Sequence, residues 1–582
     1  MKSQFPTRET RVDSGSGAHS SVPPTPPTMT RKHSLLVHAA FAAATLVVAS
    51  SVFAAQDSAR VAKADTRAGA VPLADNLGTL HRTVQTSSPL AQRYFDQGLR
   101  LYYAFNHAEA VRNFREAQRL DPNCAMCVWG EAAALGPNIN APMDTAAERV
   151  AVAATQRGLG LLRTGKVKPG EEPFLRAIEL RYLGTKAATR AGRDTAYAAA
   201  MATIAERSPD DVDALALAAE AQMDLAPWVY WTSEGTARPG TEQALAWLER
   251  GMKLAPEHPG ACHFYIHAVE AVHPTRAVAC AERLASLMPG AGHIVHMPAH
   301  IYIRVGRWAD AIESNKHAVH ADQQYFDGPH SPDYKFYQAA YGSHNHHFLT
   351  MAAVMAGASA TAIESSHAVL GIITPDVARA VPPVEPMLAI PVQTLVTFGR
   401  WEDVLDTPMP PSDLRLASGH FRYARGVAFA ATGRRAEAMA AIDSIRAVAE
   451  GMPEGQPRMT LDIAALAVEG EVALRNDDAP AAVTAFTRAA EIEDRIAYME
   501  PPTWYYPIRQ SLGMALLAAG RPGDAERVYL EDLERFPENG WSLTGLAQAL
   551  RAQDRADEAA AVDARLAKAW RLADVKPTAS RF

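Results

Sequence analysis

Histidines recur at helical spacing in three short stretches of this chain. The stretches are P-G-A-C-H-F-Y-I-H-A-V-E (259–270), A-G-H-I-V-H-M-P-A-H (291–300) and S-H-N-H-H-F-L-T-M (343–351). Steps of three and four residues place side chains on one face of a helix. Seven histidines then form one stripe: His263, His267, His293, His296, His300, His344 and His347. Because imidazole is the commonest metal-ligating side chain, the stripe predicts a transition-metal site.

The stripe offers more ligands than one ion needs. Zinc and similar ions take three or four protein ligands, whereas the stripe has seven imidazoles, with Glu270 and Met351 beside them and His330 nearby in sequence. Two ions, or one ion with supporting histidines, both satisfy this count. Imidazole suits zinc, copper and iron, and a thioether favours copper. We expect copper or zinc, with iron as a third option.

The chemistry of such a site depends on whether a coordination position stays open. With one position open, the ion can act as a Lewis acid or bind oxygen, and the protein would be an enzyme. With every position filled, the ion would be stored or would brace the fold. The sequence does not assign catalytic residues, and it contains neither a Walker A loop nor an H-E-x-x-H or G-x-S-x-G motif.

The stripe is embedded in a repeat of about 34 residues. Residues 91–124 have Gly98 in a first apolar segment, Ala110 and Ala117 in a second, and Pro122 after it. Small residues at these positions let two antiparallel helices pack closely. The pattern closely resembles the tetratricopeptide repeat. A Gly followed by a polar residue marks the turn of further units: Gly306, Gly399, Gly433 and Gly520.

This resemblance implies an all-α fold, an α-solenoid with a right-handed superhelix of about eleven or twelve helical hairpins between residues 91 and 573. Repeats of this kind stack because one hairpin alone cannot bury its apolar face. In tetratricopeptide repeats the stripe positions face the concave groove, so we expect the histidines there. The same groove offers an alternative function, in which it holds a peptide or an envelope protein and no metal.

The repeats divide into three blocks. Residues 81–258 form N-terminal repeats, 259–377 a histidine-rich block with an insertion at 326–342, 378–573 C-terminal repeats with a cap, and 574–582 a tail. Insertions in repeat proteins tend to line the binding face. Candidate groove residues are therefore Tyr334, Tyr337, Tyr341, Trp504 and Arg509.

The N-terminal residues predict export. Residues 1–28 are rich in Ser, Pro and Thr, and either are disordered or precede the true start at Met29. Residues 29–55 have a basic start, an apolar run and a small-residue exit, which predicts a cleaved signal peptide rather than an anchor. Residues 56–80 would be a linker. We expect a periplasmic or secreted protein with no membrane span after cleavage.

The composition of the chain limits the classes of partner that it can be expected to bind. The formal net charge of −7 gives no reason to expect nucleic acid as a partner. The four cysteines are Cys124, Cys127, Cys262 and Cys280. Cys124-Ala-Met-Cys127 is followed by Val128 and not by the His of a haem-attachment motif. We expect Cys124 and Cys127 to form a structural disulfide or a pair of packed thiols. The sequence does not determine how the four cysteines pair.

Overall fold

The computed structural model describes residues 71–184 and 189–582, and these residues form helices and connecting turns without a β-strand. The predicted disordered start, the signal peptide and most of the linker lie outside the described residues. No helix among those described combines the length and hydropathy that a membrane span requires. The all-α fold class predicted from the repeat is confirmed.

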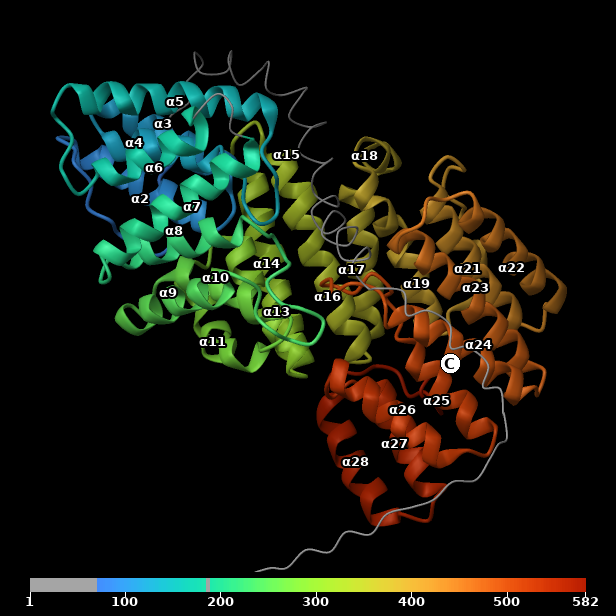
Figure 1. Cartoon of the computed structure of the whole chain (residues 1–582). Helices are drawn as coiled ribbons and strands as arrows, with labels where there is room; N and C mark the ends of the chain where they lie inside the picture. The colour runs from blue at the N-terminus through green and yellow to red at the C-terminus, as the bar shows by residue number, and fades with distance from the viewer. Residues whose placement is uncertain (1–70, 185–188) are drawn as a thin grey trace, which may run out of the picture.

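Twelve helix pairs follow one another along the described chain (Figure 1). The first six are α2 (Pro89–Tyr103) with α3 (His107–Leu120), α4 (Ala125–Ala134) with α5 (Thr145–Arg163), α6 (Glu172–Leu183) with α7 (Arg190–Arg207), α8 (Val212–Met223) with α9 (Thr241–Leu254), α10 (Pro259–Val269) with α11 (Val278–Leu287), and α12 (Gly292–His296) plus α13 (Pro298–Arg304) with α14 (Trp308–Asp327). The last six are α16 (Ser343–Met355) with α17 (Ser359–Ile372), α19 (Ile390–Thr397) with α20 (Trp401–Asp406), α21 (Arg415–Ala431) with α22 (Arg435–Glu450), α23 (Gln456–Arg475) with α24 (Ala479–Glu493), α25 (Ile508–Ala518) with α26 (Pro522–Arg535), and α27 (Gly540–Arg551) with α28 (Ala556–Ala569).

Small residues and glycine turns shape these pairs as the sequence predicts. A Cβ on Gly98 would lie 2.8 Å from the Phe114 ring, so the side-chain-free position lets α2 and α3 approach. Gly433 and Gly520 have φ of 75° and 68°, a left-handed conformation that glycine adopts without the cost of a Cβ clash. The chain can therefore reverse between paired helices within a few residues.

The histidine-rich block departs from the plain repeat. Pro298 divides the first helix of its pair into α12 and α13, because proline removes a helical hydrogen-bond donor. The predicted insertion continues α14 to Asp327 and then forms α15 (Tyr334–Tyr337) and a π-helical turn, η2 (Gln338–Gly342), which run directly into α16. Two 3₁₀ segments, η1 (Pro274–Ala277) and η3 (Pro382–Ala389), and a short α18 (Pro375–Ala380) complete the elements.

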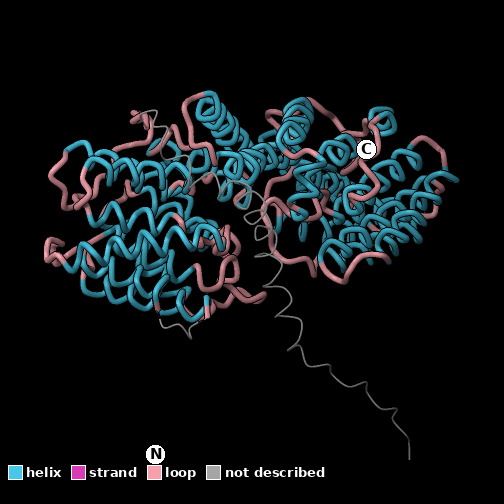
Figure 2. Tube along the Cα trace, turned by 90° about the horizontal axis from the view of Figure 1, so that it is seen from above, coloured by secondary structure: helices cyan, strands magenta, loops and turns pink. Residues whose placement is uncertain are grey.

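The apolar core runs along the stack in two main parts. One covers the pairs from α2 to α17, and the other covers those from α19 to α28. Seen from above, the hairpins form two stacked arms joined across the middle (Figure 2). The arms are tied together where the Trp541 indole donates to the Val354 carbonyl (2.8 Å) and the Trp570 indole to that of Met355 (3.0 Å). The predicted block boundaries at 258 and 377 stay a prediction.

Candidate metal centre

Four helices bring six of the seven predicted histidines together. α10 carries His263 and His267, α12 carries His293 and His296, α13 carries His300, and α16 carries His344. The insertion before α16 does not displace that helix, since His344 meets the histidines of α12 and α13. The six side chains form two groups of three, which we call the first and second triads.

The first triad consists of His263, His267 and His293. The Nε2 atom of His263 lies 3.0 Å from Nε2 of His267 and 3.1 Å from Nε2 of His293. The triad therefore joins an i, i+4 pair on α10 to one histidine of the next repeat. Its ligand atoms all lie within 4.8 Å of one another, close enough to share one ion.

The second triad consists of His296, His300 and His344. Nε2 of His300 lies 2.9 Å from Nε2 of His296 and 3.5 Å from Nε2 of His344. This triad repeats the plan of the first, with a pair from one repeat and a single histidine from the following one. The two triads are adjacent, because the rings of His267 and His300 have centroids 5.5 Å apart.

One carboxylate serves both triads. Glu270, the residue that caps the end of α10, places Oε1 3.4 Å from Nδ1 of His267 and Oε2 2.5 Å from Nδ1 of His300. Glu500, from the segment before α25, lies 3.4 Å from the same Nδ1 of His300. Carboxylates that accept from the outer nitrogen of a ligating histidine fix its tautomer and orientation. Glu270 has this geometry towards His267. At His300, Glu270 and Glu500 lie within ion-pair distance of Nδ1 without the alignment of a hydrogen bond.

The outer nitrogens of the other paired histidines also contact oxygen. Nδ1 of His263 donates to the carbonyl oxygen of Tyr103 (2.6 Å), and Nδ1 of His296 donates to Oδ1 of Asn315 (2.7 Å). The Asn315 amide is oriented by its own donation to the Ala311 carbonyl (2.7 Å). With the proton on Nδ1, a neutral imidazole presents a lone pair at Nε2.

This tautomer assignment leaves two lone pairs facing each other in the first triad. His263 and His267 both hold their protons on Nδ1, and their Nε2 atoms are 3.0 Å apart. Two acceptors at this distance repel each other unless a cation lies between or beside them. In the second triad, a doubly protonated His300 can donate from Nε2 to His296, so the first triad carries the stronger argument for an ion.

The acid–base properties of the histidines follow from burial and from the carboxylates. Burial, reinforced by neighbouring imidazoles, lowers the pKa of His263, His267, His293, His296 and His344 well below the usual value. Burial acts in the same direction on His300, but Glu270 and Glu500 outweigh it and raise the pKa of His300 to about 9. Five of the six imidazoles are therefore neutral at physiological pH and available as ligands.

The triads are buried and do not line an open groove, contrary to the expectation from the repeat register. The five histidines of α10, α12 and α13 are between 0 and 3 % exposed, and His344 is half-buried. Phe105, from the turn between α2 and α3, packs against His263 and His293, at 4.5 and 5.4 Å between ring centroids. Phe348 packs on all three rings of the second triad at 4.4–4.8 Å. These rings cover both triads, and only His344 among the six histidines stays partly exposed.

Long connections complete the cover. The indole of Trp228, in the segment between α8 and α9, lies 5.0 Å from the His267 ring. Tyr341 of the insertion lies 4.6 Å from the His293 ring, and Tyr337 accepts a hydrogen bond from the His293 backbone N–H (3.1 Å). Two of the three tyrosines of the insertion therefore contact His293, and their role in binding stays a prediction.

The remaining predicted residues lie elsewhere. His347 stacks on Tyr505 (5.7 Å between centroids) and belongs to neither triad. His330 and Tyr334 stack on each other at 4.0 Å, within the insertion. Met351 is buried in the apolar core. Trp504 packs on Tyr423, and Arg509 pairs with Asp494 and Glu531. His347 therefore lies apart from the other six histidines of the stripe, although His344, on the same helix, joins the second triad.

Three groups at the centre were not found from sequence. Phe105 and Asn315 have ordinary repeat positions, and Glu500 is 230 residues from Glu270 in the chain. Their roles depend on which repeats and connections meet in space. The sequence offers a weak signal only for Glu500, which begins the unusual segment E-P-P-T-W-Y-Y-P.

The cysteines form two pairs. Cys124 and Cys127 are joined by a disulfide at the start of α4. Cys262 and Cys280 are buried thiols on α10 and α11, with their Sγ atoms 2.6 Å apart and the Arg283 guanidinium 3.3 Å from Cys262. The first finding agrees with the structural role expected for Cys124-Ala-Met-Cys127.

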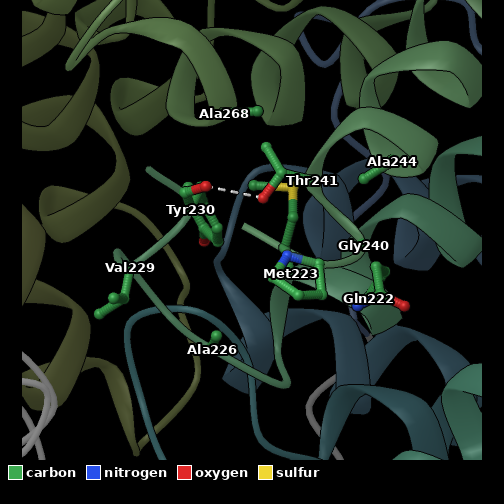
Figure 3. Close-up of a pocket in the computed structure, with 10 residues that line it drawn as sticks. Gln222, Met223, Ala226, Val229, Tyr230, Gly240, Thr241, Ala244 and Ala268 are labelled. Carbon is green, nitrogen blue, oxygen red and sulfur yellow. Dashed lines mark hydrogen bonds between the residues drawn. The ribbon is translucent and has the colours of Figure 1, made fainter. Parts of the chain in front are cut away.

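A small pocket lies beside α10 without opening onto the triads. Tyr230, Met223, Gly240 and Ala268 are among the residues that surround about 20 Å³, room for one water molecule. Thr241 closes it by donating to the Tyr230 carbonyl (2.8 Å; Figure 3). It is too small to admit an organic substrate.

Comparisons with known proteins support no assignment of family. No family model and no curated protein matches the chain. Among solved structures, the human IFIT1 dimer with m7Gppp-AAAA is 13% identical over 84% of this chain and 92% of its own, with a TM-score of 0.31. The P58(IPK) TPR domain (11%, 80% and 99%, 0.22) and yeast Tom70 (10%, 82% and 91%, 0.27) are similarly remote. At these scores the likeness supports no argument about function, so the solenoid assignment rests on the helix pairs themselves.

Proposed function

We propose that this chain is an exported metalloprotein that holds two transition-metal ions, one in each histidine triad. The observation that carries the proposal is the 3.0 Å approach of the Nε2 lone pairs of His263 and His267, whose Nδ1 atoms both contact oxygen. The second triad has the same plan, and aromatic rings cover both. Two ions are favoured over one ion with supporting histidines because two all-histidine sets of three are present, although His267, Glu270 and His300 form a third set that shares one histidine with each.

The donor set favours copper or zinc, with iron as the third option. The first triad supplies three neutral imidazoles, and the second supplies two neutral imidazoles together with His300, whose pKa is raised to about 9 and which must lose its proton to bind an ion. Imidazole ligands suit these ions, whereas magnesium and calcium prefer oxygen ligands. Glu270 lies behind both triads and would orient His267 and His300 rather than serve as a primary ligand. Three protein ligands leave a coordination position for water or a small molecule, the arrangement of catalytic rather than structural sites. Lewis-acid or redox chemistry on a small ligand is therefore the activity to look for.

Export is part of the proposal. It is supported by the signal-like residues 29–55 and by the Cys124–Cys127 disulfide, since disulfides persist mainly in oxidising compartments.

Elemental analysis of untagged protein tests the metal proposal. We expect two equivalents of copper, zinc or iron in the wild type, and about one in each of the variants His263→Ala/His267→Ala and His296→Ala/His300→Ala. His317→Ala/His320→Ala is a matched control, because both of these histidines are exposed on α14. Wild-type protein that is metal-free, and that takes up none of these ions on dialysis, would overturn the proposal.

The alternative function, a scaffold that binds a polypeptide, has support from a different part of the molecule. The C-terminal hairpins already hold a non-helical segment of this chain, as described next.

A further inference from the structure

The last nine residues lie against the repeats instead of projecting from them. Asp574 accepts hydrogen bonds from the backbone N–H groups of Ser359 (2.7 Å) and Ala360 (2.9 Å), at the start of α17. From there the chain has no helix, bends at residues 578–580 and returns to the C-terminal arm, where Ser580 and Arg581 are 0 and 3 % exposed. The C-terminus is marked inside that arm, beside α24 and α25 (Figure 1).

The contacts of residues 578–582 are mainly with the first helices of successive hairpins, joined by Tyr529 from α26. Gln548 on α27 donates to the Thr578 carbonyl (2.5 Å), and Ser580 Oγ donates to the Gln510 carbonyl on α25 (2.8 Å). Because the Ser580 hydroxyl is thereby used as a donor, it accepts from the Tyr529 hydroxyl (2.8 Å). The repeats therefore contact both the backbone and the side chains of this segment.

The last two residues make the largest contacts. The Arg581 guanidinium stacks on the Tyr506 ring, lies 5.6 Å from the Trp541 ring centroid and donates to Oε1 of Gln510 (3.1 Å). The Phe582 ring lies 5.9 Å from that of Trp541, and Arg475 on α23 donates to the Phe582 oxygen (2.9 Å). Aromatic rings beneath a guanidinium form a cation–π site.

Arg581 is incompletely satisfied for a buried arginine. Among the described residues, its Nε and Nη2 atoms have no hydrogen-bond partner. An unpaired buried charge opposes folding, so the fit of this segment is less favourable than its burial suggests. A segment held in this way can be displaced.

We propose that the inner face of α23, α25 and α27 is a recognition surface for a non-helical Ser-Arg-aromatic segment, and that residues 577–582 occupy it intramolecularly. Solenoids of helical hairpins present such concave faces for binding. The fitting partner is a second polypeptide with the same arginine and aromatic pair, which binds when residues 577–582 leave. This inference does not depend on the metal proposal.

Peptide competition on the full-length chain tests the proposal. The probe is a fluorescein-labelled synthetic peptide of residues 574–582, and the protein is the variant Ser580→Ala/Arg581→Ala/Phe582→Ala, whose own segment no longer competes. We expect saturable binding by this variant, at least about tenfold tighter than by the wild type, because a tethered segment has an effective concentration near the millimolar range. A peptide carrying Arg581→Ala should bind at least about tenfold more weakly.

Three outcomes overturn the proposal: no binding by a variant whose circular dichroism matches the wild type, equal binding by both chains, or equal binding of both peptides. If the triple variant loses helical signal, the single variant Arg581→Lys replaces it, because lysine keeps the charge but loses the planar stacking. Binding of the peptide to wild-type protein with formation of dimers would show that the segment exchanges between copies, which also requires the surface to exist.

Discussion

The histidine block and the C-terminal arm use the same helical position for different chemistry. In α10, α12 and α16 the first helix of each pair presents imidazoles, which are covered by Phe105, Phe348 and long connections. In α25 and α27 the first helix presents Gln510 and Trp541, which are covered by the chain's own residues 577–582. The backbone plan is shared, so the side chains on this face decide whether it suits an ion or a polypeptide.

The largest expected effect is on metal-dependent stability, which should change in the histidine block and not in the C-terminal arm. His263→Ala/His296→Ala removes one ligand from each triad, so we expect loss of both ions. At a metal concentration about a thousandfold above the dissociation constant, each ion should contribute about 4 kcal/mol to unfolding free energy. Thermal unfolding with and without added metal measures this. In the Ser580→Ala/Arg581→Ala/Phe582→Ala background, binding of the 574–582 peptide to the C-terminal arm should not change. A parallel loss of peptide binding would show that the two regions are coupled.

Matched phenylalanine substitutions sharpen the comparison. Phe348 and Phe486 are both fully buried, the first against the second triad and the second against Gly470 in the C-terminal arm. Phe→Ala at either position should lower the free energy of unfolding by about 3–5 kcal/mol. Only Phe348→Ala should weaken metal retention in a chelator challenge. Equal retention by both variants would contradict the role given to the aromatic cover.

The stability that Asp213 gives to the region next to the first triad should depend on pH. Asp213 accepts from His258, Arg82 and Tyr103, and the Tyr103 carbonyl in turn accepts from His263. Burial alone would raise the pKa of Asp213, but these partners lower it to about 2. A lowered pKa stabilises the fold above the ordinary value near 4 and is lost as the pH falls towards 2.

Asp213→Asn should therefore lower the free energy of unfolding at neutral pH by about 2–3 kcal/mol and flatten its dependence between pH 4 and 2. Urea titrations at several pH values measure both. Asp210→Asn is the control, since Asp210 pairs with Arg250 at the surface with its side chain 78% exposed, and it should change stability by less than about 1 kcal/mol.

The smallest effect concerns glycine turns in the two regions. Gly306 and Gly433 have φ of 76° and 75°, but a Cβ on Gly306 would lie 2.7 Å from the Pro537 carbonyl, whereas one on Gly433 would meet no atom within 4 Å. Gly433→Ala should cost about 1 kcal/mol, from the backbone conformation alone. Gly306→Ala should cost more, because its Cβ also pushes against Pro537 in the turn between α26 and α27. Equal unfolding midpoints for the two variants would show that this contact between the arms contributes little.

Much of the fold and part of the centre could be predicted from the chain. Small residues such as Gly98 and turn glycines such as Gly433 act locally, so they define the hairpins and their approximate number. Histidine spacing places pairs on α10 and across α12 and α13 for the same reason. The stripe predicted an open groove, and this was wrong because Phe105 and Trp228 cover the histidines. Both residues lie in connections between helices, and no periodic pattern in the sequence predicts where a connection packs.

The sequence by itself determined the helical repeat, the reversal points and the pairing of histidines on one helix face, because helix periodicity and glycine conformation depend on near neighbours. Only the tertiary structure decided that six histidines divide into two triads, that Glu270 and Glu500 meet at His300, and that His347 turns away to Tyr505. It likewise decided that residues 577–582 return to the C-terminal arm. These contacts join residues up to about 230 positions apart, and they depend on how the repeats stack rather than on any one repeat.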